Sequence, residues 1–374
     1  MRINLTNLIM TSQLCMDRIF MYVLTVLIFC LLPGLGCRKT PSLEKVRYGI
    51  TPYQDTAIPF VAEELQWYKD NGIDVEFVPL AWGDVVNAIA GGAIDVALYN
   101  FNSFQAPYEN AAQGNIKPVF YCAMYVFKGA AIIIHEKSTM KPFRELPNEP
   151  DSLRKNRVIE TARQLKGKKI AVTKGTEYEQ IVLAALSLAG LNPQKDVKLI
   201  HATPEDALAA FLANDVDAFG AGLTERVEAR RHEGTELLVA SDVSPPIIDG
   251  LITSERFAQE HQVLLDKLVR LWFQTIQFME KDLKTNSKYV LDYLTKKAST
   301  RYTPEEYSVA WTFQIFPPTT QEAYSLLYNE TSPYFWRRAW SANNEFLLSQ
   351  GKIKSPVPYD AFWGEQVIKR LISQ

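Results

Sequence analysis

The sequence predicts an α/β fold in which two lobes each hold a mostly parallel sheet flanked by helices. The chain has 374 residues, which is long for one domain and favours about two. Predicted strands and helices alternate along much of the chain, as they do in parallel sheets covered by helices. The same order of elements then returns further along the chain. We interpret this recurrence as an internal duplication of a β-α-β-α-β unit.

The first unit follows a short polar segment. Apolar residues at helical spacing, such as Phe60, Val61 and Leu65, predict its first helix, and Gly72 is placed to end that helix. Alternating polarity predicts the strand that follows. In order, the predicted elements are strand 46–50, helix 59–71, strand 73–80, helix 84–90 and strand 95–99.

The second unit repeats this order without a gap. Its predicted elements are strand 169–173, helix 181–189, strand 197–200, helix 204–212 and strand 217–220. Identical residues recur 122 positions apart, at Thr51 and Thr173, Asp84 and Asp206, and Asp95 and Asp217. Chance produces a few identities at some spacing, but it does not readily align the predicted elements as well.

The remaining segments join or extend the two units. Between them, an apolar strand at 130–135 precedes a polar stretch at 136–166, which contains one predicted helix near 152–164. After the second unit, strands at 237–240 and 250–253 precede a helical C-terminal extension. Its predicted helices are 263–284, 289–297, 304–316, 321–328 and 334–350.

The first 37 residues have the layout of a secretory signal. Ile19–Leu32 is apolar except for Thr25, and it lies between Arg18 and a segment of small residues that ends at Cys37. A membrane-spanning helix needs about 20 apolar residues, so we expect a cleaved signal at 1–37 and a polar tether at 38–45. A retained anchor helix is the alternative, and translation from Met16 instead of Met1 stays open.

Charge and cysteine usage exclude several classes of protein. Lys plus Arg total 40 and Asp plus Glu total 42, so no strong positive charge favours nucleic acid. Cys15 and Cys30 lie in the signal, which together with Cys37 leaves Cys122 alone as an expected small core residue.

Motifs for catalysis are absent from the sequence. None of the four His has a metal-binding spacing such as H-E-x-x-H, and there is no P-loop, dinucleotide fingerprint or nucleophile elbow. We therefore expect no enzyme, no cofactor and no metal site.

A binding site is expected where the parallel strands end, because ligands of open parallel sheets lie beyond the carboxyl ends of the strands. Several of these ends precede helices, whose N-termini suit anions, and they also offer aromatic walls and neutral hydrogen-bonding groups. The candidate residues are Tyr53, Trp82, Gly83, Asn100, Asn102, Thr176, Glu177, Thr224 and Glu225.

Each candidate also has a purely structural interpretation. Trp82 is equally well explained as a packing residue, and Asp84 and Ser103 as helix caps. Glu177 and Glu225 fit exposed acids in the first turn of a helix, where they favour the helix dipole. Asp95 and Asp217 are expected to form turn hydrogen bonds, and the aromatic residues of the tail are expected in the core.

Four segments carry a resemblance to a known family: 88–98, 165–176, 206–218 and 342–354. On these segments the chain resembles the substrate-binding proteins of importers for sulfonates, taurine, nitrate and thiamine-precursor pyrimidines. The resemblance implies a periplasmic-binding-protein-like fold of type II. Lobe one would be 46–130 plus 255–374, lobe two 131–254, and the crossovers would lie near 128–132 and 253–257.

The resemblance also places the ligand between the lobes, at the candidate residues above, with Asp249 near the mouth of the cleft. The anion cradle of many members is reduced here to Trp82 and Gly83, which argues against a sulfonate or nitrate. Aromatic residues with amides fit a flat heterocycle such as a pyrimidine, the helix N-termini fit a small anion, and the acids fit an amine.

The position of Cys37 directly after Gly36 resembles a bacterial lipoprotein signal, although Gly34 stands where that family usually has Leu. This resemblance implies that Cys37 carries lipid and holds the exported protein at a membrane surface.

Together these features predict the extracytoplasmic solute-binding component of an ABC importer. We expect a monomer that closes over a small molecule by a hinge and delivers it to a permease with its ATPase. Two alternatives stay open. One is an enzyme of thiamine pyrimidine synthesis on the same fold, although the cysteine cluster of that enzyme is missing. The other is a ligand-sensing lipoprotein that is not coupled to transport.

Overall fold

The computed structural model describes residues 43–374 apart from residues 145, 148, 298–301 and 374. The predicted signal, the lipidation site Cys37 and residues 38–42 of the tether lie outside the described residues. Residues Glu44–Gln374 form a unit of their own. Among the described residues, none of the helices is long and apolar enough to cross a membrane.

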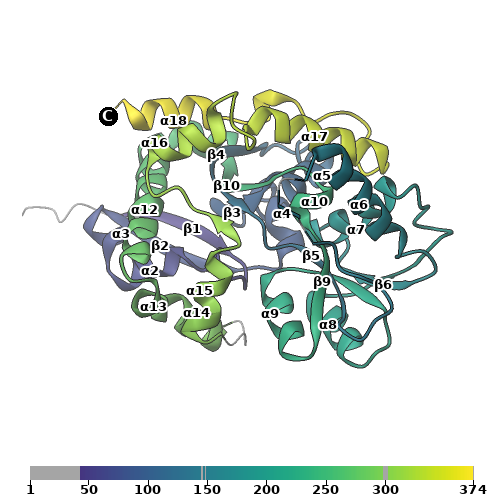
Figure 1. The fold of residues 1–374 in the computed structure, drawn as a ribbon. Helices are drawn as coiled ribbons and strands as arrows, with labels where there is room; N and C mark the ends of the chain where they lie inside the picture. The colour runs from purple at the N-terminus through teal and green to yellow at the C-terminus, as the bar shows by residue number, and fades with distance from the viewer. Residues whose placement is uncertain (1–42, 145, 148, 298–301, 374) are drawn as a thin grey trace, which may run out of the picture. The chain divides into compact units, whose positions relative to one another are not determined.

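The first sheet has six strands in the order β11-β4-β10-β3-β1-β2 (Figure 1). Strand β1 pairs in parallel with β2 and β3, whereas β10 is antiparallel to β3 and β4, and β11 is antiparallel to β4. The bounds of the strands are β1 (Glu44–Ile50), β2 (Ile73–Pro79), β3 (Val96–Asn100), β4 (Pro118–Phe127), β10 (Ile247–Ser254) and β11 (Gln314–Ile315).

The second sheet has five strands in the order β7-β6-β8-β5-β9. Strand β6 pairs in parallel with β7 and β8, and β5 is antiparallel to β8 and β9. Its strands are β5 (Ala131–His135), β6 (Lys169–Val172), β7 (Lys198–His201), β8 (Ala218–Ala221) and β9 (Gly234–Val239). In both sheets, three parallel strands are thus followed by two strands that each pair antiparallel with the strand before, and the first sheet adds β11. This fits the fold class that the sequence predicts.

One bonded pair recurs in the two sheets. The backbone N–H of Arg47 donates to Asp95 Oδ2 at 2.8 Å, and the backbone N–H of Lys169 donates to Asp217 Oδ2 at 2.8 Å. Lys169 lies 122 positions after Arg47, and Asp217 lies 122 positions after Asp95. We call each pair a clasp, because it ties the first strand of a unit to the turn before the third. Both aspartates thus have a structural role, as expected, but their bonds run to a strand 48 residues away and not within the turn.

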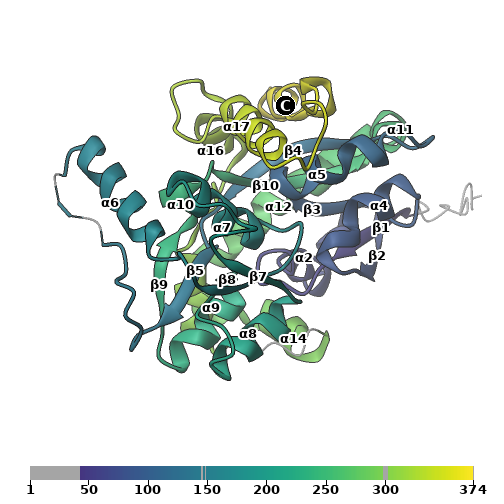
Figure 2. The same ribbon diagram turned by 90° about the vertical axis from the view of Figure 1, so that its right-hand side faces the viewer.

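Helices cover both sheets. In the second sheet, α7 and α10 lie over one face while α8 and α9 lie over the other (Figure 2). The helices of the first unit and its connection are α2 (Pro59–Glu64), α3 (Trp67–Asp70), η1 (Trp82–Asp84), α4 (Val85–Ala90), α5 (Phe101–Ala111) and α6 (Asp151–Arg163). Those of the second unit and its exit are α7 (Glu177–Leu188), α8 (Pro204–Leu212), α9 (Leu223–Arg231), α10 (Ala240–Val243) and α11 (Glu255–Glu260).

The C-terminal extension is helical and returns to the first sheet. Helix α12 packs on α2, and α17 packs on α5. Its elements are α12 (Gln262–Lys281), α13 (Leu283–Asn286), α14 (Lys288–Lys297), α15 (Pro304–Trp311), α16 (Thr320–Ala323), the π-helix η2 (Tyr324–Tyr328), α17 (Trp336–Ser349), η3 (Tyr359–Ala361) and α18 (Gly364–Ile372).

Strands buried on both faces hold the core. All ten residues of β4 are buried, and its side chains alternate between two layers: Phe120 packs edge-on against Phe101, while Tyr125 stacks on Trp272 of α12. Trp340 of α17 is fully buried, as expected for the aromatic tail. Cys122 is also fully buried, and burial raises the pKa of its thiol to about 12, which suits the expected core residue.

Three sequence-based expectations differ from the structure. The helix predicted over 59–71 is two short helices, because Gln66 adopts a left-handed conformation with φ of 61° between them. Strand β4 was not anticipated, since an apolar run buried on both faces has no periodicity to mark it. The return crossover expected near 253–257 differs too, because β10 already belongs to the first sheet and the chain leaves the second sheet after Val239.

Candidate functional site

A small cavity lies where the carboxyl ends of the parallel strands in both sheets meet. Its volume is about 10 Å³, enough for about one water molecule. The first sheet contributes the loop after β1, the start of η1, and single residues of β4 and β10, and the second sheet contributes the N-termini of α7 and α9. The lining residues are Tyr53, Gln54, Asp55, Trp82, Phe127, Glu177, Tyr178, Leu223 and Asp249.

Trp82 is held rigidly on the side of the first sheet. Its Nε1 donates to Ser103 Oγ at 2.9 Å, and its backbone carbonyl accepts from the hydroxyl of Tyr99 at 2.8 Å. The ring of Tyr53 meets it edge to face at 5.6 Å between centroids. Trp82 is therefore both a packed residue and a wall of the cavity, so the two interpretations of it do not compete.

Helix α7 carries Glu177 into the cavity from the side of the second sheet. Thr176 caps this helix by accepting from the backbone N–H of Tyr178 at 3.2 Å. The carboxylate of Glu177 accepts from Asn100 Nδ2 at 3.3 Å. Asn100 is itself the N-cap of α5, where its Oδ1 accepts from the backbone N–H of Ser103 at 2.8 Å. One amide thus caps a helix of one unit and binds an acid of the other.

Four carboxyl groups are buried in and beside the cavity. Burial raises the pKa of both Glu177 and Glu225 to about 7. Burial also raises the pKa of Asp55, although its oxygens accept from the hydroxyl of Tyr125 and the backbone N–H of Thr56, both at 2.9 Å.

Asp249 is the least compensated of the four. Burial, followed by repulsion from Asp55 and Glu177, raises its pKa well above the usual range of a carboxyl. One of its oxygens, Oδ2, is buried without a hydrogen-bond partner, which is costly for a polar atom.

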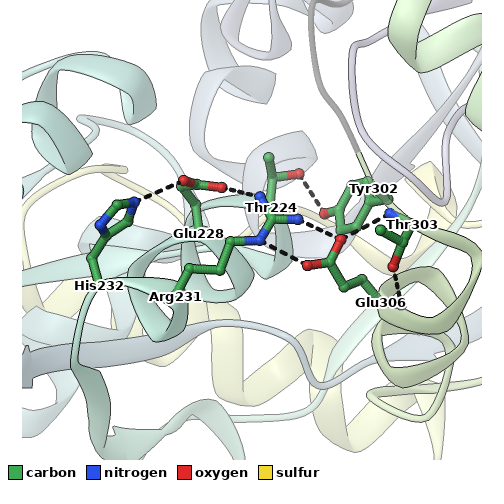
Figure 3. Close-up of polar contacts among 7 residues, drawn as sticks. All are labelled: Thr224, Glu228, Arg231, His232, Tyr302, Thr303 and Glu306. Atoms are coloured by element: carbon green, nitrogen blue, oxygen red, sulfur yellow. Dashed lines mark hydrogen bonds and ion pairs between the residues drawn. The ribbon is translucent and has the colours of Figure 1, made fainter.

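Direct bonds join the first and last turns of α9 to the C-terminal extension. Tyr302 donates to Thr224 Oγ1 at 2.8 Å, and Arg231 Nε donates to Glu306 Oε1 at 2.7 Å (Figure 3). Figure 3 shows Arg231 of α9 between Glu306 and Glu228, with His232 on the far side of Glu228. We call the Tyr302–Thr224 and Arg231–Glu306 contacts the rim latch.

Helix α7 and the C-terminal extension meet at the opposite edge. Gln180 donates to Asn343 Oδ1 at 3.1 Å, and Lys352 forms an ion pair with Glu179 at 3.0 Å. Asn102 of α5 also donates to Gln180. Bonded contacts from both α7 and α9 therefore join the second lobe to the C-terminal extension.

The residues expected at the site divide into three groups. Tyr53, Trp82, Glu177 and Asp249 line the cavity. A second group does not line the cavity. Asn100, Asn102 and Thr224 bond to the opposite lobe, and Thr176 and Glu225 cap α7 and α9. Gly83 is exposed and does not line the cavity.

Two structural interpretations of the candidates are wrong. Glu177 and Glu225 are 6% and 5% exposed, so neither is a solvated first-turn acid. Asp84 makes no side-chain cap, whereas Asn100 caps the helix that contains Ser103.

Sequence reasoning missed Gln54, Asp55, Phe127, Tyr178 and Leu223. For Asp55 a signal was available, because it lies 122 positions before Glu177 and the duplication therefore makes the two acids equivalent. No comparable signal marks Phe127, whose strand was not predicted.

The site does not resemble a metal centre. The described residues contain no group of three or more His, Cys, Asp or Glu side chains that could hold a metal ion. The side chains that line the cavity are mainly aromatic rings and carboxyl groups.

Comparison with known proteins identifies the family. The NMT1-like family matches residues 39–294, which is more than half of the chain. The chain belongs to the NMT1-like family. This agrees with the expected kinship to substrate-binding proteins, because sulfonate-binding and nitrate-binding proteins are among its other similarities.

Two curated relatives and one solved structure illustrate this. A putative aliphatic sulfonates-binding protein of Escherichia coli is 35% identical over 106 residues, 28% of this chain and 30% of that protein. A nitrate import ATP-binding protein of Synechococcus elongatus is 26% identical over 202 residues, 53% of this chain and 29% of that protein. The chain thus spans less than a third of the length of either curated relative.

The solved structure is the periplasmic aliphatic sulphonate-binding protein of Escherichia coli. It superposes with a TM-score of 0.61 at 16% identity, covering 85% of this chain and 91% of that one. At this identity the likeness shows the fold alone, and it is the periplasmic-binding-protein fold that the sequence predicts.

Proposed function

We propose that this NMT1-like protein is the extracytoplasmic solute-binding component of an ABC importer. It would bind a small molecule between its two lobes and release it to a permease with its ATPase. The observation that carries the proposal is the cavity itself: loops from the carboxyl ends of two duplicated sheets converge there with aromatic and carboxyl side chains. The similarity to a putative aliphatic sulfonates-binding protein supports the same role, and the similarity to a nitrate import ATP-binding protein supports a link to import.

The cavity requires movement before it admits a solute. At about 10 Å³ it holds about one water molecule, so a ligand enters only when the two sides separate. The rim latch and the Asn100–Glu177 bond must then break, and ligand contacts to both sides must compensate for them. This is the hinge closure of a solute-binding protein. We place one lobe at 44–127 plus 247–374 and the other at 131–239, because β10 belongs to the first sheet.

The proposed location is the outer face of a membrane. Cleavage at Cys37 and lipidation of that residue would tether an exported monomer there. Cys37→Ala should abolish incorporation of radiolabelled palmitate and release the protein from membrane fractions. Retention of the label in this variant would contradict the anchor without affecting the binding site.

The binding role is tested by thermal shift with the full chain purified in detergent. A panel of pyrimidines, sulfonates and amines should contain at least one binder, and at 100 times its Kd that binder should stabilise the protein by about 2.7 kcal/mol. The bound molecule should be recovered chemically unchanged, because the proposal is for binding without catalysis. Turnover of the molecule would favour the enzyme alternative.

A further inference from the structure

The charge of the cavity lining has one sign. Asp55, Glu177 and Asp249 line it, and none of its lining residues is Lys, Arg or His. Arg226 on α9 is paired with Glu236 at 2.6 Å, and Lys352 in the C-terminal extension is paired with Glu179 at 3.0 Å. An anionic solute would therefore meet carboxyl groups and no counter-charge.

The unpaired atoms in the lining are acceptors. Gln54 is 4% exposed and its Oε1 has no hydrogen-bond partner, and the same is true of Asp249 Oδ2, in a residue 2% exposed. Buried acceptors of this kind are costly unless a donor reaches them. A carboxylate, sulfonate or nitrate brings only acceptors, whereas an ammonium, amidinium or guanidinium group brings several N–H donors.

Aromatic rings form the rest of the wall. Tyr53, Trp82, Phe127 and Tyr178 all line the cavity. The faces of such rings attract a cation within about 6 Å of the ring centre, and they also stack on flat molecules. The pKa values of Glu177 and Asp249 are raised because both groups are buried without a counter-charge, and a bound cation would supply that charge and favour their ionised, hydrogen-bond-accepting forms.

From these contacts we propose that the ligand is a small organic cation whose charge lies on N–H groups, such as an amine, amidine or guanidine. It would donate to Asp249 Oδ2, Gln54 Oε1 and Glu177 and lie against Trp82 and Tyr53. This inference rests on the proposed binding function and names its ligand class. It sets this chain apart from the sulfonate and nitrate relatives, whose ligands have the opposite charge.

The test is a binding panel on the full chain in detergent at constant ionic strength. Benzamidine, benzamide and benzoate form the reference triple, because they share one shape and differ in charge. Matched sets of amines and amidines, neutral amides, and carboxylates and sulfonates extend each arm, and calcium chloride forms a metal arm. The cationic arm should contain the binders, at least ten-fold tighter than their neutral and anionic isosteres.

The outcomes separate the two proposals. Binding confined to neutral molecules, to anions or to calcium would overturn the cation inference and leave the binding function in place. Binding by no member of any arm would count against the binding function itself.

Variants of the acceptors give an independent readout. Asp249→Asn should lower the affinity for the cation that binds in the panel by at least ten-fold, and it should lower the affinity for the neutral isostere far less. Glu260→Gln, which removes an equal charge from an exposed position on α11, should change neither. Because Asp249 is buried and partly unpaired, its variant should melt no lower than the parent protein.

A second variant covers the case in which Asp249→Asn does not fold. Gln54→Met keeps the length of the side chain and removes its acceptor, so it should lower the affinity for the cation several-fold. Equal affinity of both variants and the parent protein for the cation would overturn the assignment.

Discussion

The two copies of the β-α-β-α-β unit share a frame and differ in what they present to the cavity. Each has the same clasp between its first strand and the turn before its third. At the strand ends the copies diverge: Trp82 of the first corresponds to Pro204 of the second, and Ser103 corresponds to Glu225. Only the acid after the first strand is kept, as Asp55 and Glu177. The strands, helices and clasps are thus duplicated, whereas the residues at the cavity differ between the copies. The first copy contributes the indole of Trp82, and the second contributes Glu225 beside the cavity.

The comparison is tested most strongly at Trp82. Trp82→Ala should lower the free energy of unfolding by about 3–5 kcal/mol, because the ring is buried against Tyr99 and Tyr53, and it should abolish the thermal shift by any ligand found. Pro204→Ala, at the equivalent position on α8, should cost less than about 1 kcal/mol and leave binding intact. Chemical denaturation measures both variants. Equal costs would mean that the copies do not differ here.

The buried Glu177, which is equivalent to Asp55 in the first copy, predicts how the stability of the protein depends on pH. The pKa of Glu177 is about 7 in the folded protein, above its usual value near 4.3 in an unfolded chain. The folded state therefore keeps a proton that the unfolded state has lost, so stability is highest at low pH and falls as pH rises through about 7. The loss reaches about 3 kcal/mol for such a carboxyl.

Glu177→Gln should flatten this pH dependence. Asn100 faces Glu177 directly, while Asp55 and Glu225 repel it from the first strand end and from α9. Urea denaturation at pH 5, 6, 7 and 8 measures the slope. Asp206→Asn on the exposed face of α8 provides the control, and an unaltered slope in Glu177→Gln would contradict the assignment.

The clasps should differ in strength. Asp95 accepts from the backbone of Arg47 and also from its guanidinium, at 2.8 and 3.1 Å to Oδ2, whereas Asp217 accepts from the backbone of Lys169. We therefore expect Asp95→Ala to cost about 2 kcal/mol and Asp217→Ala about 1 kcal/mol. Thermal denaturation of the two variants measures this difference. A larger loss at Asp217 would show that the second copy depends more on its clasp than the first.

The smallest expected effect concerns the rim. Asn102 and Thr224 are equivalent by the spacing of 122, and each bonds across to the other side: Asn102 to Gln180, and Thr224 to Tyr302. Tyr302→Phe should weaken closure by about 1 kcal/mol, seen as a larger radius of gyration in solution scattering. Tyr359→Phe, an exposed tyrosine that bonds Ser341, should leave the radius unchanged. If the radius of gyration of Tyr302→Phe equals that of the parent protein, Tyr302 does not contribute to the rim latch.

The frame could be predicted from sequence because it depends on local patterns. Alternating polarity in β2 and helical spacing in α8 are set by which face is buried, and the duplication doubles each signal. The left-handed turn at Gln66 and the doubly buried β4 depend on tertiary packing, so no local pattern marks them.

The site could be predicted only in part. The rule that ligands lie at strand ends identified Tyr53, Trp82 and Glu177 as candidates, and all three line the cavity. Burial of Glu177 could not be inferred, because it comes from Asn100 and its neighbours 77 residues away in the chain. Gly83 follows the same rule and is nevertheless exposed, since the turn of η1 points it outward.

The hydrogen bond between Asn100 and Glu177 has a consequence for selectivity. A solute that donates to Glu177 Oε2 competes with the amide of Asn100, which already donates to that oxygen at 3.3 Å. The protein thus contains its own competitor for the site. At this oxygen, a solute with a stronger donor than an amide therefore gains more than one with a weaker donor.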